Sequence, residues 1–161
     1  MKVEFKDPSE LLQLIMSLEW KWEVISMEFT TFFPRTVRQY DSIMVVVDML
    51  IDVAHFILVK STFSASDVAQ VFIMNMVRLH GALKKIVSEG DANLTSKFWK
   101  DLSAGLSIEF AFSIAYHPQT YGKIERVNRI LEDMLRMYVI HQEWKWEEYL
   151  PLVEFSYNNG Y

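Results

Sequence analysis

The sequence contains no cysteine among its 161 residues. That absence excludes disulfide bonds and every zinc site built on cysteine thiolates. Glycine and proline are also scarce, with five and four residues, and no stretch has the composition of an internal linker. The length therefore suits one main domain with its own core.

Long apolar runs and an excess of positive charge are missing as well. No uninterrupted apolar stretch approaches the roughly 18 residues of a membrane span, and the start Met1–Pro8 lacks the apolar centre of a signal peptide. We expect a soluble, intracellular protein that has no membrane partner. The net charge is −5 and the isoelectric point is about 5.4, so nucleic-acid binding would need a local basic patch.

Apolar and aromatic residues are abundant, and their order indicates the fold. Hydrophobic residues make up 51% of the chain and aromatic residues 14%, which is typical of a globular protein. The spacing predicts three strands, a helix, a strand, a helix, a strand and two helices, an order that fits a mixed α/β sheet with helices on both faces. The predicted strands are Trp20–Phe29, Ser42–Asp48, Val53–Val59, Ala82–Val87 and Leu106–Phe112, and the predicted helices are Ser64–Gly81, Thr95–Leu102, Gly122–Val139 and Trp144–Tyr157.

A short helical pattern precedes these elements and begins after Pro8 and Ser9. We therefore divide the chain into a helical leader, residues 1–18, and a main domain, residues 19–161.

The segment Ala115–Met137 combines a predicted loop with a helix. Pro118 and Gly122 punctuate the loop, and apolar residues recur at helical spacing after Gly122. Glu125 is therefore expected in the first turn, where the helix dipole favours a carboxylate and where Asn128 shares its face. A solvated surface acid is the simpler interpretation of Glu125.

The order of residues in this segment matches a known motif. The run His117-Pro-Gln-Thr-Tyr-Gly-Lys-Ile-Glu-Arg126 resembles the third catalytic segment of integrases from gypsy-type retrotransposons, which are similar in turn to retroviral integrases. The resemblance extends over about residues 20–161. It implies a ribonuclease-H-like fold with a five-stranded mixed sheet, and DNA integration as the activity. It also implies the DNA ends of the element and target DNA as partners, a homo-oligomer, and a nuclear location for a functional integrase.

In that family two aspartates and one glutamate bind a pair of Mg²⁺ or Mn²⁺ ions. The ions activate the attacking hydroxyl and stabilise the leaving oxygen of a phosphodiester. The first and second family segments correspond to Trp22–Phe29 and Ile86–Ser96, where Glu28 and Glu89 stand in place of the aspartates. The resemblance thus implies a catalytic, metal-binding set made of Glu28, Glu89 and Glu125.

Two of these three acids depart from the family. A glutamate keeps the charge but moves it outward by one methylene, whereas Mg²⁺ tolerates little deviation from ligand distances of about 2.0–2.1 Å. A misplacement near 1 Å can cost about a hundredfold in rate. We therefore expect weak or absent catalysis. A catalytically inactive ribonuclease-H-like interaction module and a fragment of a decayed element remain as alternatives.

Several basic and polar residues are candidates for DNA contact. Each lysine or arginine could neutralise a phosphate, and the glutamine could touch sugar or base. Residues 115–137 carry four basic and three acidic side chains, so an ordinary charged surface is an equal alternative. The candidates are Lys97, Lys100, Gln119, Lys123, Arg126 and Arg129.

The remaining acids and histidines give weaker signals. Asp91 could replace Glu89 as a ligand, but a turn residue beside Gly90 is the favoured interpretation. Asp48 and Asp52 are expected to be solvated turn carboxylates. The four histidines lie on separate segments without paired metal spacing, so we do not expect a zinc site.

Overall fold

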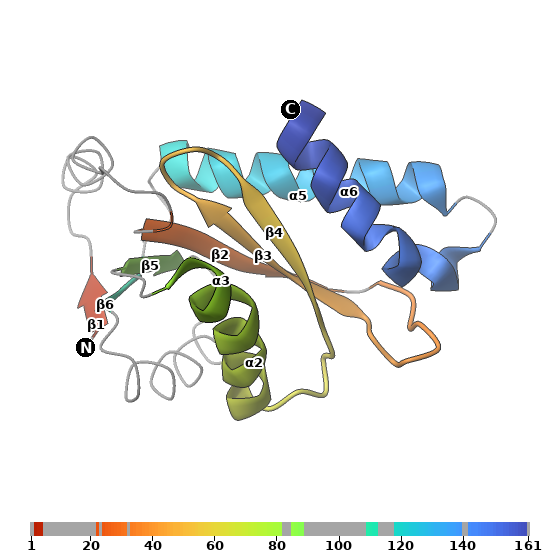
Figure 1. Cartoon of the computed structure of the whole chain (residues 1–161), viewed down its shortest axis with the longest axis horizontal. Coiled ribbons are helices and arrows are strands. Elements are labelled where there is room, and N and C mark those ends of the chain that lie inside the picture. Colours follow the sequence, from red (N-terminus) through yellow and green to blue (C-terminus); the bar gives the residue numbers. More distant parts are fainter. Residues whose placement is uncertain are drawn as a thin grey trace.

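The computed structural model describes residues 2–4, 22, 24–31, 33–81, 85–88, 109–112, 118–139 and 142–160. These residues form one sheet that has helices on both faces (Figure 1). The strands are β1 (Lys2–Glu4), β2 (Val24–Thr30), β3 (Ser42–Asp48), β4 (Ala54–Val59), β5 (Lys85–Ser88) and β6 (Glu109–Phe112). The helices are α2 (Ala65–Phe72), the π-helix η1 (Ile73–Val77), α3 (Arg78–His80), α5 (Pro118–Tyr138), the 3-10 helix η2 (Glu143–Lys145) and α6 (Trp146–Gly160).

The sheet is mixed, as expected, but the described residues give it six strands rather than five. Its order is β1-β6-β5-β2-β3-β4. The strands β2, β3 and β4 pair antiparallel, whereas β5 runs parallel to β2 and β6, and β1 runs parallel to β6. The unexpected strand is β1, whose three residues are too few to show the alternation by which a strand is recognised in a sequence.

The strand β3, which lies between β2 and β4, is buried along its whole length. Met44 and Val46 belong to one apolar cluster, whereas Ile43, Val45 and Val47 belong to a second cluster. Because successive side chains of a strand point to opposite faces, β3 separates two layers of core. The continuous apolar run in the sequence therefore did indicate a strand covered on both faces.

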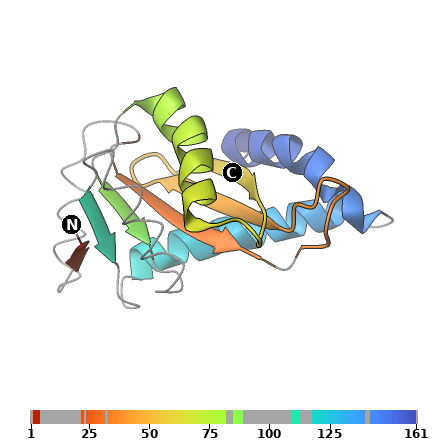
Figure 2. The same ribbon diagram turned by 90° about the horizontal axis from the view of Figure 1, so that it is seen from below.

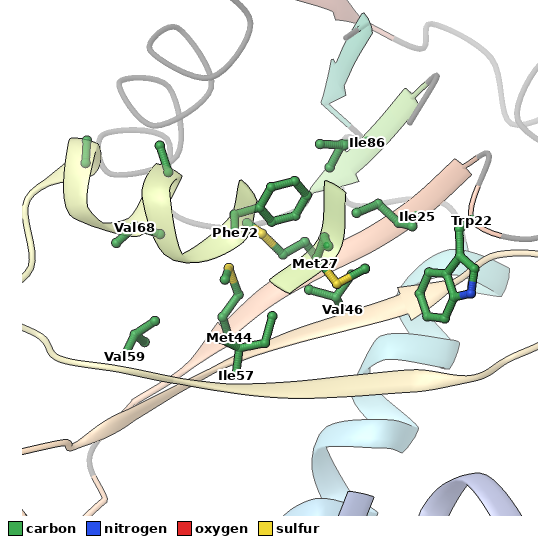
Figure 3. Packing of buried hydrophobic residues seen from close by; sticks show 13 residues of the cluster. Trp22, Ile25, Met27, Met44, Val46, Ile57, Val59, Val68, Phe72 and Ile86 are labelled. Atoms are coloured by element: carbon green, nitrogen blue, oxygen red, sulfur yellow. The ribbon is translucent and has the colours of Figure 1, made fainter. Parts of the chain in front are cut away.

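The first cluster lies between the sheet and the helical segment α2–η1 (Figure 3). Val68 and Phe72 of α2 and Met76 of η1 are buried against it. The helix begins where the sequence predicts, because the Ser64 side chain accepts from the Asp67 backbone N–H and the Asp67 carboxylate accepts from the Ser64 backbone N–H. The helical segment ends at Gly81, whose φ of 76° is a conformation that favours glycine.

The second cluster lies between the other face of the sheet and the helices α5 and α6. Figure 2 shows α5 running along the sheet on the side opposite α2. Buried residues recur every three or four positions along both helices, so each presents one apolar stripe to the sheet. They are Ile124, Val127, Leu131 and Leu135 of α5, and Trp146, Leu150, Val153 and Tyr157 of α6.

The start of α5 corrects one expectation. The helix begins at Pro118 rather than after Gly122, since proline is well suited to a first turn, where its missing N–H leaves no hydrogen bond unmade. Glu125 is consequently the eighth residue of α5 and not part of its first turn. The favourable interaction with the helix dipole that the sequence indicated therefore does not apply to Glu125, because that effect fades beyond the first turn.

The helix α6 corrects another. The sequence places Tyr149, Leu152, Val153 and Phe155 on one apolar face and ends the helix at Tyr157 with a turn after it. Leu152 and Phe155 are instead exposed, by 45% and 66%. The helix continues to Gly160, because Asn158 bonds both backbone groups of Ala54 in β4 and so holds this last turn to the sheet.

Some predictions lie outside the described residues. Among them are the helix of the leader and the helix predicted over Thr95–Leu102. Within the described part of the leader, Lys2–Glu4 is strand and joins the same sheet as the main domain. In the part of the chain that the structure describes, no helix is long and apolar enough to cross a lipid bilayer.

Candidate functional site

The site begins with the alternation of β2. Ile25, Met27 and Phe29 pack with the first cluster, so Glu28 and Thr30 point to the opposite face of the sheet. The helix α5 lies against that face. A polar pair on an otherwise buried strand therefore meets the polar side of this helix.

Asn128 of α5 connects the two polar residues of β2. Its Nδ2 donates to Glu28 Oε2 over 3.0 Å, and its Oδ1 accepts from Thr30 Oγ1 over 3.1 Å. Both distances are those of ordinary hydrogen bonds. The amide thus fixes one carboxylate oxygen of Glu28 and leaves the other oxygen available for a further ligand.

The carboxyl group of Glu28 has a raised pKa. Burial between the sheet and α5 is the largest cause, because it disfavours the charged form. The hydrogen bond from Asn128 lowers the pKa, and the negative charge of Glu125 raises it. Glu28 and Glu125 therefore lie close enough to repel one another, although the sequence separates them by almost a hundred residues.

Glu125 occupies the more open side of the pair. Its side chain is 51% exposed, and Arg129, one turn further along α5, approaches it to 3.8 Å. Glu28 is half-buried and Glu125 is solvated. A cation from solvent could therefore reach a position beside the two carboxylates.

Glu89 lies outside the described residues. The residue before it, Ser88, is the last residue of β5 and pairs in parallel with Met27. Met27 is in turn the residue before Glu28. The sheet thus aligns the positions that immediately precede the two acids.

The donor set suits a hard divalent cation, which prefers carboxylate oxygens. The repulsion between Glu28 and Glu125 is also what a bound cation would relieve. Among the described residues, however, no group of three or more histidine, cysteine, aspartate or glutamate side chains could hold a metal ion. The described chain supplies two carboxylates of the expected three.

The candidate DNA contacts differ in their surroundings. Arg126 and Arg129 are exposed on α5. Lys123 instead binds within the protein, with its Nζ 2.8 Å from Asp52 Oδ1 and 3.1 Å from the Met49 carbonyl oxygen. Gln119 lies in the first turn of α5, while Lys97 and Lys100 lie outside the described residues.

Asp48 corrects an expectation of the sequence. It was expected to be solvated, yet it is fully buried. Its two carboxylate oxygens accept from the backbone N–H groups of Trp22 and Leu50, over 3.1 and 2.9 Å. A buried carboxylate needs such partners, and the turn residues Trp22, before β2, and Leu50, after β3, supply them. Asp52 is exposed by 59%, as expected.

Sequence reasoning did not assign the role of Asn128. Its position three residues after Glu125 placed it on the same helix face, but the contact to Glu28 depends on how α5 lies on the sheet. Thr30 gave no signal, since threonine is common in strands for reasons of shape alone.

Comparison with known proteins identifies relatives in one class of mobile element. The chain is 33% identical over 149 residues to the transposon Tf2-3 and Tf2-4 polyproteins of Schizosaccharomyces pombe, and the match covers 92% of this chain and 11% of each polyprotein. No protein-family model matches the chain.

Solved structures of integrases share the fold. The catalytic core of BIV integrase gives a TM-score of 0.66 at 22% identity, with 87% of this chain and 86% of that chain covered. The HTLV-2 integrase catalytic core, a dimeric form in complex with magnesium, gives 0.66 at 14% identity, with 88% and 89% covered. The simian T-cell lymphotropic virus intasome, in complex with a PP2A regulatory subunit, gives 0.69 at 18% identity, with 87% and 49% covered.

The chain is thus similar to one segment of gypsy-like retrotransposon polyproteins, and it shares the fold of retroviral integrase catalytic cores. Its ribonuclease-H-like fold agrees with the fold class that the resemblance implied. The chain spans about a tenth of the length of the polyproteins that it matches.

Proposed function

We propose that this integrase-core-like domain acts in DNA integration as a metal-dependent polynucleotidyl transferase. The observation that carries the proposal is the approach of Glu28 and Glu125 across the contact between β2 and α5. The alignment of Ser88 beside Met27 supports Glu89 as the third member. The relatives in retrotransposon polyproteins support DNA as the substrate.

Glu28, Glu89 and Glu125 are the proposed ligands of Mg²⁺ or Mn²⁺. The HTLV-2 core is described in complex with magnesium, which supports the choice of metal. When bound, such ions supply charge stabilisation to the attacking and leaving oxygens of a phosphodiester. Asn128 orients Glu28 by holding one of its oxygens, so that the other can face Glu125.

Reduced activity is part of the proposal. Glutamates at positions 28 and 89 carry their carboxylates one methylene further from the backbone than the aspartates of the family. The strong dependence of Mg²⁺ on ligand geometry makes this change costly. The hydrogen bond from Asn128 holds the Glu28 carboxylate at the distance from the backbone that the longer glutamate side chain gives it.

The DNA path follows the exposed side of α5. Arg126 and Arg129 are exposed cations of α5 that would neutralise phosphates, although Arg129 also lies beside Glu125, and Lys97, Lys100 and Gln119 extend the proposed contact. Lys123 contributes less because Asp52 neutralises it. A protein with this activity would meet its target DNA in the nucleus.

The decisive experiment restores the aspartates. Glu28→Asp and Glu89→Asp are combined, and strand transfer is measured with a duplex that carries the element ends, in Mg²⁺ and in Mn²⁺. We expect strand transfer to rise by about a hundredfold over the unaltered chain. Adding Glu125→Gln to the double variant should abolish the gain. Failure of the double variant to transfer strands, while it still binds the metal and the duplex, would contradict the assignment of these acids.

A non-enzymatic interaction module is the second candidate function. The observation that favours it is the exposure of Trp144 in η2 and of Leu152 and Phe155 in α6. Exposed apolar groups mark contact surfaces. The proposed partner is a second copy, in line with the dimeric form described for the HTLV-2 core. Sedimentation analysis of the chain and of Phe155→Ser tests this: a dimer that the substitution converts to monomer supports the module, and a monomer in both excludes it.

A further inference from the structure

Two histidines that are far apart in the sequence meet at the end of the first cluster. His55 of β4 and His80 of α3 place their Nε2 atoms 2.9 Å apart. The ring centroids are 5.1 Å apart, much further than the two nitrogens, so the rings meet through their Nε2 atoms and do not stack on each other. No pattern along the chain indicated this pair, because the two residues belong to different elements.

Trp22 covers both rings. Its indole stacks on His80 at 4.2 Å and on His55 at 4.9 Å between centroids. Trp22 is itself buried within the first cluster (Figure 3), and its backbone N–H is held by the buried carboxylate of Asp48. The stack therefore holds the two partly exposed imidazoles against the buried indole.

A contact at 2.9 Å between two ring nitrogens requires one donor and one acceptor. Two neutral imidazoles satisfy this with a single proton between the Nε2 atoms. Glu154 Oε1 lies 3.6 Å from His55 Nδ1, which favours a proton on that nitrogen of His55. His55 Nε2 is then the acceptor, and His80 donates through its Nε2–H.

We propose that His55 and His80 form a proton-dependent latch, which the hydrogen bond between their Nε2 atoms closes near neutral pH and which opens when both rings are protonated. One added proton charges a single ring and still leaves one donor and one acceptor at the contact, whereas two added protons charge both rings. Two N–H groups would then face each other at the Nε2 contact, and neither could accept. Two like charges would also lie on rings whose nitrogens are 2.9 Å apart, where they repel each other.

The charged groups around the pair come from several elements. His80 lies on α3 and His55 on β4, while Asp48 ends β3 and Glu154 lies on α6. The pKa of His80 is lowered by burial first and then by His55, and the negative charge of Asp48 raises it. Burial and the neighbouring imidazole outweigh Asp48, so the surroundings favour the neutral ring of His80.

The latch joins β4, which is paired within the sheet, to the end of α3, which is not. The strand β4 is held by its pairing with β3. His80 instead ends the helical segment, and Gly81 follows it with a turn conformation. Opening the latch would therefore release the end of α3, the segment that precedes β5 in the chain, and leave the antiparallel strands paired.

The sign of the pH effect follows from the lowered pKa of His80. The folded protein binds a proton at this ring less readily than the unfolded chain, whose histidine pKa is about 6.5. The latch therefore contributes its full stability above that value and loses it as the pH falls through the lower folded pKa.

Imidazole ¹⁵N NMR of the 161-residue chain tests the proton arrangement directly. At about pH 7.5 we expect His80 as the Nε2–H tautomer and His55 as the Nδ1–H tautomer, followed by a coupled titration of the two rings on acidification. Two rings with the same tautomer, or two independent titrations near the ordinary histidine pKa, would overturn the proposal.

Thermal unfolding of His80→Gln provides a second test. A glutamine amide can donate to His55 Nε2 but does not titrate, so the loss in Tm from about pH 7.5 to 5.5 should fall to roughly half of the wild-type loss. Arg78→Gln, an exposed change on the same helix, should retain the wild-type loss. Equal losses in all three proteins would contradict the latch, and the NMR measurement decides the question if His80→Gln does not fold.

Discussion

Asn128 Nδ2 donates to Glu28 Oε2 over 3.0 Å and so joins the middle of β2 to α5. The same amide accepts from Thr30, so one side chain satisfies two polar groups at a largely apolar contact. The position of Glu28 relative to Glu125 depends on this hydrogen bond. The candidate site is therefore a property of the packing between strand and helix.

Removing the amide should destabilise the protein. In Asn128→Ala, the half-buried Glu28 carboxylate loses its donor and Thr30 loses its acceptor, which should lower the free energy of unfolding by about 1–3 kcal/mol. Urea unfolding at pH 7 measures the loss. Asn159→Ala is the matched control, since that amide bonds only a carbonyl within its own helix. An equal loss in the two variants would show that the contact to Glu28 is unimportant.

Neutralising Glu28 should have the opposite effect. Because burial raises its pKa, the folded state binds a proton at Glu28 more tightly than the unfolded chain. Its contribution to stability is therefore lost as the pH rises from the ordinary glutamate pKa of 4.5 through the raised folded pKa. Glu28→Gln should raise the Tm at pH 7, by an amount corresponding to about 1.4 kcal/mol for each unit of pKa shift.

The hydrogen bond from Asn128 survives in Glu28→Gln because the glutamine oxygen can still accept it. Glu148→Gln, an exposed change on α6, is the control and should leave the Tm within experimental error. A lower Tm for Glu28→Gln at pH 7 would mean that the charged carboxylate stabilises the fold.

The two leucines of α6 should respond differently to truncation. Leu150 is 3% exposed and Leu152 is 45% exposed, although the sequence pattern favoured Leu152 as the buried residue. Leu150→Ala should cost about 2–5 kcal/mol of unfolding free energy. Leu152→Ala should change it by about 0.5 kcal/mol or less. Chemical denaturation of the pair tests the orientation of α6, and similar costs would place the helix with a different face against the sheet.

The cations of α5 should contribute unequally to DNA binding. Arg129→Gln should weaken binding and reduce the slope of log K against log salt by about one. Lys123→Gln should change the slope less, because Asp52 and the Met49 carbonyl already bind the ammonium group. Fluorescence anisotropy with a DNA duplex at several salt concentrations measures both. A larger effect of Lys123 would show that it leaves Asp52 when DNA binds.

The periodic part of the fold could be predicted from residues. The run Ser42–Asp48 and the cap at Ser64 gave the strand and helix that the structure contains, because alternation and capping are local properties. Short or ambiguous signals failed. Lys2–Glu4 is too short to show a pattern, and Pro118 was interpreted as a loop residue although it begins α5.

The candidate site could be predicted only in outline. The resemblance to integrases singled out Glu28 and Glu125, and the structure places them close together. It did not indicate that Asn128 holds Glu28, nor that Lys123 is bound to Asp52. Those contacts depend on the rotation of α5 on the sheet, which no local pattern specifies.

The sequence by itself determined the long periodic elements, such as the strand Ser42–Asp48 and the helix that begins after Ser64, and the residues that resemble the acids of an integrase, since spacing and residue type are written along the chain. Only the tertiary structure decided that Asp48 is buried, that His55 meets His80, and that Glu28 shares its surroundings with Glu125. The physical reason is that burial and electrostatic coupling depend on distances between elements, and packing alone sets those distances.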